Sequence, residues 1–307
     1  MEDERQSRWQ RIIAARSVAL FSHAVRADVL FEGYSKVLSG GVHIGYSIVR
    51  YEFDNKKKQF IATTFLKTNE FGGNLTESLK AYSTDDMRPI SYQYTTLVGT
   101  QVKVIDAKFE KGKLLASVKE GGKVGKIIKD IPKGVFLSSF LAYLILKSPE
   151  GMKVDSSHPF QAIAEEDASV DKGVYAIKNQ EDYQGIKVFK ILNEFKGSKF
   201  VSLVNDHGEV FSTKSPVQGI STELVAKPSE ATAAFPVATA TLRTLFGDIP
   251  TGQMNEISKR AQSQPQAPTS ATAAPPAPIK LPPGANKQHG VPEGQGIQVK
   301  VSPSEGK

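Results

Sequence analysis

The chain has 307 residues, of which 39% are hydrophobic and none is cysteine. This length allows one substantial hydrophobic core, and the absence of cysteine excludes disulfide scaffolds, thiol nucleophiles, thiolate metal sites and iron–sulfur clusters. The 39 basic and 32 acidic residues give a formal charge of +7, which permits an anionic partner without indicating one.

The amino-terminal segment, residues 1–27, combines features of an export signal with features that oppose one. Arg8 and Arg11 precede a partly apolar stretch, and small residues at its end have the spacing of a cleavage site. Acidic residues near the start and Arg16 inside the apolar stretch interrupt this pattern. The segment is therefore interpreted either as a signal peptide or as a short amphipathic helix.

Residues 28–228 are divided into short runs rich in Val, Ile, Tyr, Phe and Thr, with turn residues every ~8–12 positions, which is typical of an all-β domain. In residues 89–98, Tyr92 and Tyr94 alternate with polar residues, so both tyrosines are expected on the buried or concave face of a sheet. We predict strands at residues 30–38, 43–53, 59–68, 74–83, 89–98, 101–109, 114–119, 123–129, 160–165, 174–178, 186–195, 199–205, 209–212 and 220–226.

Residues 134–147 depart from the strand pattern, because they contain a long apolar run without a charge. The run is shorter than the ~20 residues that span a bilayer, and its apolar residues repeat at helical spacing around most of the circumference. It predicts a helix buried in the concave side of a curved sheet, either as a permanent core element or as a mobile cover over an apolar ligand cavity. The candidate cavity residues are Tyr92, Tyr94, Phe136, Phe140, Tyr143 and Leu144.

The carboxyl-terminal part of the chain changes in composition. Residues 229–261 contain Leu242, Leu245 and Phe246, which predict a short helical extension on the sheet, with Pro236 limiting where the helix starts. Residues 262–307 have no aromatic residue and are rich in Pro, Gln, Ala and Ser, so they predict a disordered, partly polyproline-II tail. Such a tail acts either as an inert spacer or as a ligand for a proline-recognising partner.

The sequence contains no motif for catalysis or metal binding. The five histidines lack metal-ligand spacing, no Gly-x-Ser-x-Gly element is present, and residues 121–126 lack the spacing of a P-loop. The acidic run at residues 165–167 is interpreted as a solvated edge. We therefore predict no enzymatic activity, no cofactor and no metal.

Lysines are concentrated between residues 108 and 133, where they would form a basic face if they lie on adjacent hairpins. This region has almost no aromatic residues to stack on bases, so a nucleic-acid partner is not expected. The lysines are interpreted either as protection of exposed strands against edge-to-edge pairing or as a surface for anionic lipid or an acidic protein. The candidate contact residues are Lys111, Lys113, Lys123 and Lys126.

Several motifs follow one another in a familiar order: Gly33-Tyr34-Ser35, Gly45-Tyr46, Arg88-Pro89-Ile90-Ser91-Tyr92, the apolar helix, Tyr183-Gln184-Gly185-Ile186-Lys187-Val188, and the segment from Phe200 to Val210. In this order residues 29–227 resemble the uncharacterised exported bacterial β domains with the curved-sheet fold of the outer-membrane lipoprotein carriers, including the domain often found beside transglutaminase-like modules. The resemblance implies a periplasmic or outer-membrane-associated protein whose concave apolar face holds acyl chains or a partner segment. It implies no catalytic residues.

Together these features predict a mainly β protein: a strongly curved antiparallel sheet, forming a half-barrel or open barrel, that encloses one apolar helix and precedes a disordered Pro-rich tail. We predict a non-enzymatic, exported protein of the periplasm that binds an apolar or acyl ligand in the concave face of the sheet. The alternative is a structural or adaptor protein of an envelope assembly, which binds a protein partner through the Lys-rich face or the Pro-rich tail. No transmembrane helix is expected, and peripheral membrane contact is compatible with both interpretations.

Overall fold

The computed structural model describes residues 27–237 and 239–263. The amino-terminal segment predicted for residues 1–27 and the tail predicted for residues 262–307 fall almost entirely outside the described residues.

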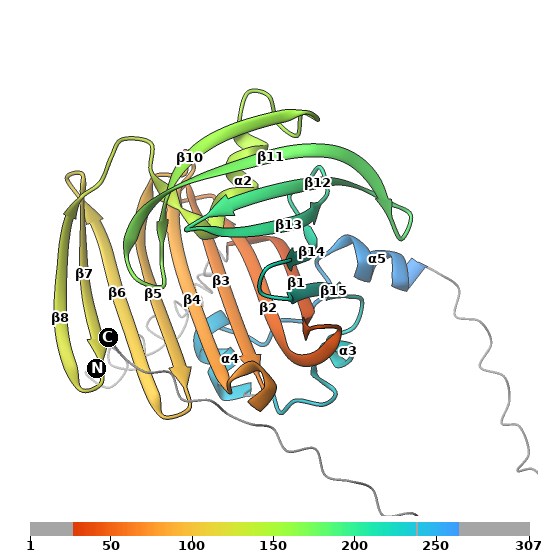
Figure 1. The fold of residues 1–307 in the computed structure, drawn as a ribbon, viewed down its shortest axis with the longest axis horizontal. Coiled ribbons are helices and arrows are strands. Elements are labelled where there is room, and N and C mark those ends of the chain that lie inside the picture. The colour runs from red at the N-terminus through yellow and green to blue at the C-terminus, as the bar shows by residue number, and fades with distance from the viewer. Residues whose placement is uncertain (1–26, 238, 264–307) are drawn as a thin grey trace, which may run out of the picture. The chain divides into compact units, whose positions relative to one another are not determined.

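The described chain forms one curved sheet of fifteen strands, in the order β8-β7-β6-β5-β4-β3-β2-β1-β15-β14-β13-β12-β11-β10-β9 (Figure 1). Neighbouring strands are antiparallel except for β9 and β10, which are parallel. The sheet is not closed, since β8 and β9 are its two edges, and the mainly β fold predicted from the sequence is confirmed. The strands are β1 (Asp28–Ser39), β2 (Val42–Asp54), β3 (Gln59–Thr68), β4 (Leu75–Thr84), β5 (Pro89–Val98), β6 (Gln101–Glu110), β7 (Lys113–Glu120), β8 (Lys123–Asp130), β9 (Phe136–Leu137), β10 (Ser156–Ala164), β11 (Ser169–Tyr183), β12 (Ile186–Phe195), β13 (Ser198–Val204), β14 (Val210–Ser215) and β15 (Ile220–Val225).

The apolar segment predicted as a helix over residues 134–147 is helical only in its second half. It begins with the short strand β9, continues through one 3-10 turn, η2 (Ser138–Phe140), and ends in helix α2 (Leu141–Lys147). The prediction is therefore wrong for the first half of the segment.

The first half is extended because its backbone binds to other parts of the chain. Phe136 and Leu137 lie in register with Ala162 and Ile163 of β10. The amide of Ser139 then donates a hydrogen bond to the carboxylate of Glu165 at 3.1 Å, where a continuous helix would direct it to the preceding turn. A distant carboxylate and a neighbouring strand thus replace the intrahelical bonds.

Helix α2 lies between the two halves of the sheet, as predicted. Phe140 and Tyr143 pack in a cluster with residues of β3 to β7, whereas Ile145 packs with residues of β11, β12 and β13. Phe140 and Ile145 are at most 1% exposed. The concave face of the sheet therefore encloses the apolar helix.

Short helices follow the last strand and pack on the sheet: α3 (Pro228–Thr232), α4 (Thr239–Phe246) and α5 (Glu256–Ser263). Leu242 and Phe246 of α4 form a cluster with Tyr46 and Phe65. Tyr46 and Phe65 point away from the face that carries α2. Tyr51 of β2 and Phe60 of β3 contact Tyr143 of α2, and each stands an odd number of positions from Tyr46 or Phe65 on its strand, which places them on opposite faces. In the helical extension predicted for residues 229–261, α4 thus covers the convex side of the sheet, whereas Ile257 of α5 packs with Phe31, whose ring contacts Tyr51 on the face that carries α2.

Candidate functional site

The predicted cavity residues belong to one hydrophobic cluster, in which all are buried except the partly buried Leu144: Tyr92, Tyr94, Phe136, Phe140, Tyr143 and Leu144. Aromatic contacts fill the space between them and the sheet, with the rings of Tyr51 and Tyr143 centred 4.8 Å apart. The hydroxyl of Tyr94 donates to Glu77 at 2.8 Å. The residues predicted to line a cavity therefore belong to a packed core.

A pocket of about 260 Å³, which we call the interior pocket, lies beside this core between α2 and the strands β12 to β14. Its walls are apolar on the helix side and mixed on the sheet side. The lining residues are Tyr51, Ser138, Ser139, Leu141, Ala142, Ile145, Ile191, Asn193, Ser202, Val204, Val210 and Thr213.

Two polar atoms in the wall of the interior pocket are buried without a hydrogen-bond partner: Oγ of Ser139 and Oδ1 of Asn193. Nearby, the hydroxyls of Ser202 and Thr213 are 3.1 Å apart and bond to each other. A buried polar atom without a partner destabilises a protein by about 1–3 kcal/mol. A ligand with a polar end would supply the missing hydrogen bonds of Ser139 and Asn193.

Glu165 holds the serines of the pocket in place, and its position corrects the sequence interpretation. It is 3% exposed, not part of a solvated edge, and accepts hydrogen bonds from the Ser138 hydroxyl at 2.5 Å and from the Ser139 amide at 3.1 Å. Burial raises the pKa of Glu165, and these hydrogen bonds oppose the rise. Burial, reinforced by the Glu165 carboxylate, also raises the pKa of Tyr51, which keeps this phenol neutral.

The interior pocket was not predicted from the sequence. Its polar atoms come from segments more than fifty positions apart, and no local motif connects Ser139 with Asn193. The one available signal was the pair Ser138 and Ser139 inside an otherwise apolar run.

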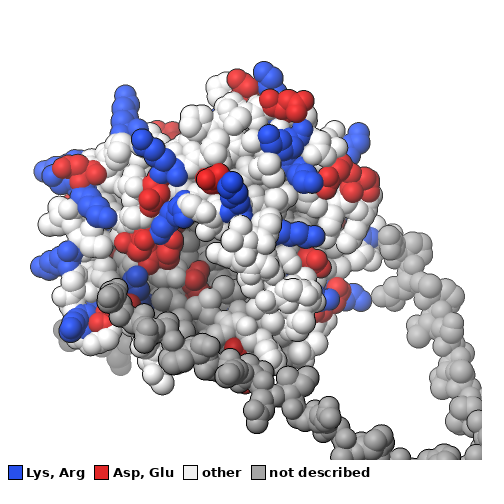
Figure 2. All heavy atoms as spheres, in the orientation of Figure 1, with Lys and Arg blue, Asp and Glu red and all other residues white. Residues whose placement is uncertain are grey.

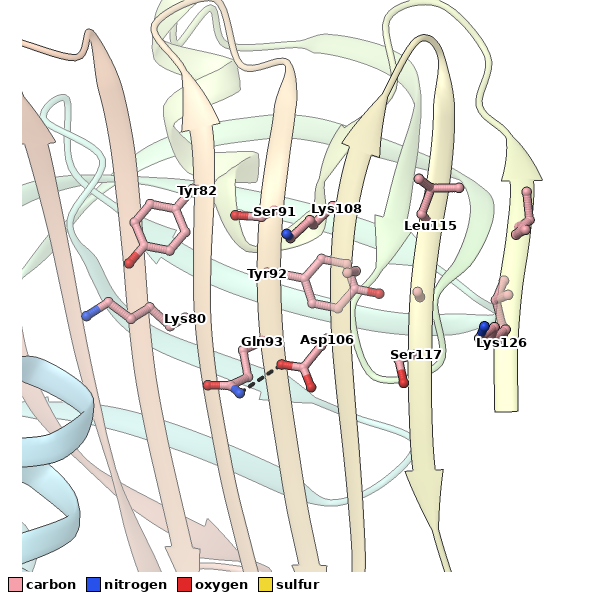
Figure 3. A pocket seen from close by; sticks show the side chains of 14 residues that line it. Lys80, Tyr82, Ser91, Tyr92, Gln93, Asp106, Lys108, Leu115, Ser117 and Lys126 are labelled. Atoms are coloured by element: carbon pink, nitrogen blue, oxygen red, sulfur yellow. Dashed lines mark hydrogen bonds between the residues drawn. The ribbon is translucent and has the colours of Figure 1, made fainter. Parts of the chain in front are cut away.

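A second, larger hollow of about 710 Å³, the outer hollow, lies on β4 to β8 (Figure 3). Cross-strand neighbours form its floor: Tyr82, Ser91, Lys108, Leu115 and Ile128 lie in one row. In the next row the Gln93 amide donates to Asp106 at 2.8 Å, as the dashed line in Figure 3 marks. At one end Lys80 donates to the carbonyl of Leu245 in α4 at 3.0 Å.

The predicted lysines lie at this edge of the sheet but do not form one face. Lys126 lines the outer hollow, and Lys113 shares that face and pairs with Asp130 at 2.8 Å. Lys123 has the opposite orientation, because it stands an odd number of positions from Lys126 on one strand, and Lys111 lies in the β6–β7 turn with φ of 51°. Figure 2 accordingly shows basic and acidic side chains intermixed over the left-hand edge, where β6 to β8 lie.

The histidines are dispersed. His43 binds the carbonyl of Gly45 at 2.8 Å, His158 is 4.0 Å from Glu150, and His207 is 3.6 Å from its neighbour Asp206. Within residues 27–237 and 239–263, no group of three or more His, Asp or Glu side chains is placed to hold a metal ion. The same residues include no helix of the length and apolarity needed to cross a bilayer.

Comparisons with known proteins give structural similarities only. No protein-family model matches the sequence, and no curated protein matches it significantly. The chain is similar to a solved β-barrel-like protein of the DUF1849 domain of unknown function from Brucella abortus, with 12% identity and a TM-score of 0.47 over 66% of this chain and 97% of the other. It is also similar to a DUF1089 family protein from Pseudomonas aeruginosa, with 13% identity and a TM-score of 0.30 over 56% of this chain and 90% of the other.

Proposed function

We propose that this protein is a non-enzymatic binding protein that takes an uncharged amphipathic ligand, such as a short acyl ester or alcohol, into the interior pocket. The observation that carries the proposal is the buried, unpartnered Oδ1 of Asn193, with Ser139 Oγ, which lies beside Glu165, in the same otherwise largely apolar wall. Ligand pockets commonly combine an apolar lining with a few polar groups that fix orientation.

The size and charge of the pocket support this ligand class. A volume of about 260 Å³ holds about nine groups of the size of a water molecule, at ~30 Å³ each. Each buried methylene contributes about 0.8 kcal/mol, so an acyl chain of this length supplies substantial binding energy. No Lys or Arg lines the pocket, and Glu165 lies behind its serines, so an uncharged head is favoured over a carboxylate.

The resemblance of the sequence to domains with the lipoprotein-carrier fold points in the same direction. Export to the periplasm is part of this proposal and rests on the sequence pattern of residues 1–27. Mass measurement of the protein recovered from its own host tests it, because cleavage of a signal peptide removes these residues.

Binding can be tested by native mass spectrometry of the full chain with 1-octanol, an alcohol that matches the volume of the pocket, and, separately, with octanoate. We expect binding of the alcohol and at least about tenfold weaker binding of octanoate, since burial of a charge without a partner opposes binding. Ala142→Trp fills the pocket from α2 and should abolish binding. The matched control is Ala240→Trp in α4, where the side chain is exposed.

Unchanged binding in the Ala142→Trp variant would assign the ligand to another site. Absence of any bound 1-octanol in the wild-type protein, together with absence of lipid from protein purified from its host, would refute the proposal. A preference for octanoate would refute the inferred ligand chemistry.

A further inference from the structure

One end of the sheet carries a row of hairpin connections, which we call the hairpin rim. It comprises the connections β1–β2, β3–β4, β5–β6, β7–β8 and β14–β15, which the strand registers place at the same edge of the sheet from β8 to β14. The β10–β11 and β12–β13 connections lie at that edge in the rest of the sheet and are not part of the rim. The amide of Gly40 donates to the carbonyl of Gly219 at 3.0 Å, so the β1–β2 and β14–β15 connections bind to each other, and the amide of Asn69 in the β3–β4 connection donates to Ile44 of β2 at 2.8 Å. In Figure 1 the β5–β6 and β7–β8 hairpins end at the lower edge of the sheet.

Exposed apolar side chains are concentrated on the hairpin rim. The 3-10 turn η1 (Glu70–Gly72) in the β3–β4 connection presents Phe71 with 75% of its surface exposed. Large apolar side chains that are about half or more exposed stand at each of the other connections: Val42, Val98, Val102, Val124 and Val217.

The opposite end of the sheet differs. Its β2–β3 and β6–β7 turns consist of Asn55-Lys56-Lys57-Lys58 and Lys111-Gly112, and the apolar residue of the β4–β5 turn, Met87, is 3% exposed. The two ends of the same strands therefore have different surface chemistry, with apolar tips at one end and polar turns at the other.

The charge near the hairpin rim is positive. Within four residues of its turns lie seven lysines and four glutamates, an excess of three positive charges: Lys36, Lys67, Lys103, Lys119, Lys123, Lys126 and Lys214 against Glu70, Glu77, Glu120 and Glu223. The same count at the β2–β3, β4–β5 and β6–β7 turns of the opposite end gives seven basic and five acidic residues, an excess of two: Lys56, Lys57, Lys58, Arg88, Lys108, Lys111 and Lys113 against Glu52, Asp54, Asp85, Asp86 and Glu110.

We propose that the hairpin rim is a contact surface for an anionic lipid bilayer, into which Phe71 and the valine tips insert at the level of the headgroups. Apolar side chains with lysines beside them bind anionic interfaces through apolar burial plus electrostatic attraction. The apolar groups stand on separate turns, whereas a protein interface requires a continuous complementary area of ~800 Å² on each partner. This surface is independent of the interior pocket.

The test is flotation of the full chain with vesicles of phosphatidylcholine and phosphatidylglycerol in equal amounts, and with vesicles of phosphatidylcholine alone. We expect binding to the mixed vesicles, weakened by salt. Phe71→Ser combined with Val124→Ser should lower the partition coefficient at least about tenfold, from the loss of buried apolar surface. Lys123→Gln should lower it about fivefold.

The matched control is Ile128→Ser. Ile128 lies on the same strand and the same face as Val124 with nearly equal exposure, 66% against 65%, but four residues, or ~13 Å, farther from the turn. The Ile128→Ser variant should bind the mixed vesicles like the wild-type protein. All these side chains are exposed, so urea midpoints should stay unchanged and loss of folding can be excluded.

Four results would overturn the proposal: wild-type binding by the Phe71→Ser/Val124→Ser variant, an equal loss in Ile128→Ser, equal binding to vesicles without phosphatidylglycerol, or no vesicle binding at all. A purified protein partner that the double variant no longer binds, in the absence of vesicle binding, would assign the rim to that protein instead.

Discussion

The carboxylate of Glu165 accepts a hydrogen bond from the Ser138 hydroxyl at 2.5 Å, at the point where the extended half of the apolar segment turns toward α2. The same carboxylate binds the Ser139 amide, and the Ser139 carbonyl accepts a hydrogen bond from Tyr51 at 2.7 Å. One buried acid thus fixes the turn that forms one wall of the interior pocket.

Replacing Glu165 with Gln should change how stability depends on pH. Burial raises the pKa of Glu165 in the folded protein, so the folded state binds the proton more tightly than the unfolded chain, in which the pKa is ~4.3. Between these two pKa values the free energy of unfolding of the wild type falls as the pH rises. The stability of Glu165→Gln relative to wild type should therefore increase over this range, by about 1.4 kcal/mol per pKa unit.

Urea unfolding at pH values from below ~4.3 to neutral measures this difference. Glu166→Gln is the control, because Glu166 is about half exposed and pairs with Lys196 at the surface. Its effect should stay within about 1 kcal/mol. A difference between Glu165→Gln and wild type that does not vary with pH would contradict the prediction.

Arg50→Ala should strongly destabilise the protein. Arg50 is 2% exposed and binds Glu32, which is also buried, at 2.5 Å, and Asp248 at 2.8 Å. Glu32 in turn accepts hydrogen bonds from Thr251 at 3.0 Å and from the Gly252 amide at 2.6 Å. Removing the guanidinium leaves a buried carboxylate without its cation, which costs about 3–5 kcal/mol.

Urea unfolding and limited proteolysis of the segment after β15 measure the effect of Arg50→Ala. The control Arg88→Ala breaks an exposed ion pair with Asp86, and such pairs contribute about 0–1 kcal/mol. Similar stabilities of the two variants would show that the Glu32–Arg50 pair does not anchor this segment.

Phe140→Ala should destabilise the protein by about 3–5 kcal/mol, since it opens a cavity in the core. Phe140 is fully buried between α2 and the sheet. Phe71→Ala makes the same chemical change at a side chain that is 75% exposed, and its effect should lie within about 0.5 kcal/mol. Thermal or urea unfolding compares the two, and a small effect of Phe140→Ala would mean that the segment around α2 is a loosely held cover.

Gly45→Ala should destabilise the protein, whereas Gly125→Ala should not. A Cβ at position 45 would overlap the Lys67 carbonyl oxygen and lie 2.8 Å from the Cα of Thr68, both backbone atoms of β3. Overpacking of this kind costs about 1–3 kcal/mol. A Cβ at position 125 meets nothing closer than 3.9 Å. Replacing this strand glycine with alanine should therefore leave the free energy of unfolding unchanged or increase it by about 0.5–1 kcal/mol. Equal urea midpoints for both variants would contradict the close approach of β2 and β3.

Most of the sheet could be predicted because its signals are local. The strand at residues 89–98 was predicted with the bounds of β5, since Pro89 starts it and Gly99, with φ of 59°, ends it. Strand β11 extends well beyond the predicted residues 174–178, because its exposed polar ends lack the apolar alternation on which the prediction depended. Strand β9 was missed, since two apolar residues inside a longer apolar run carry no periodicity of their own.

The sequence by itself determined that this protein is a curved β structure with one apolar segment inside it, because alternation, turn residues and the absence of charge over residues 135–146 are properties of neighbouring positions. Only the tertiary structure decided that Ser139 and Asn193 meet at one pocket, that Glu165 is buried, and that the lysines divide between two faces. These outcomes depend on the register between strands and on the curvature of the sheet, and pairing over long distances along the chain sets both.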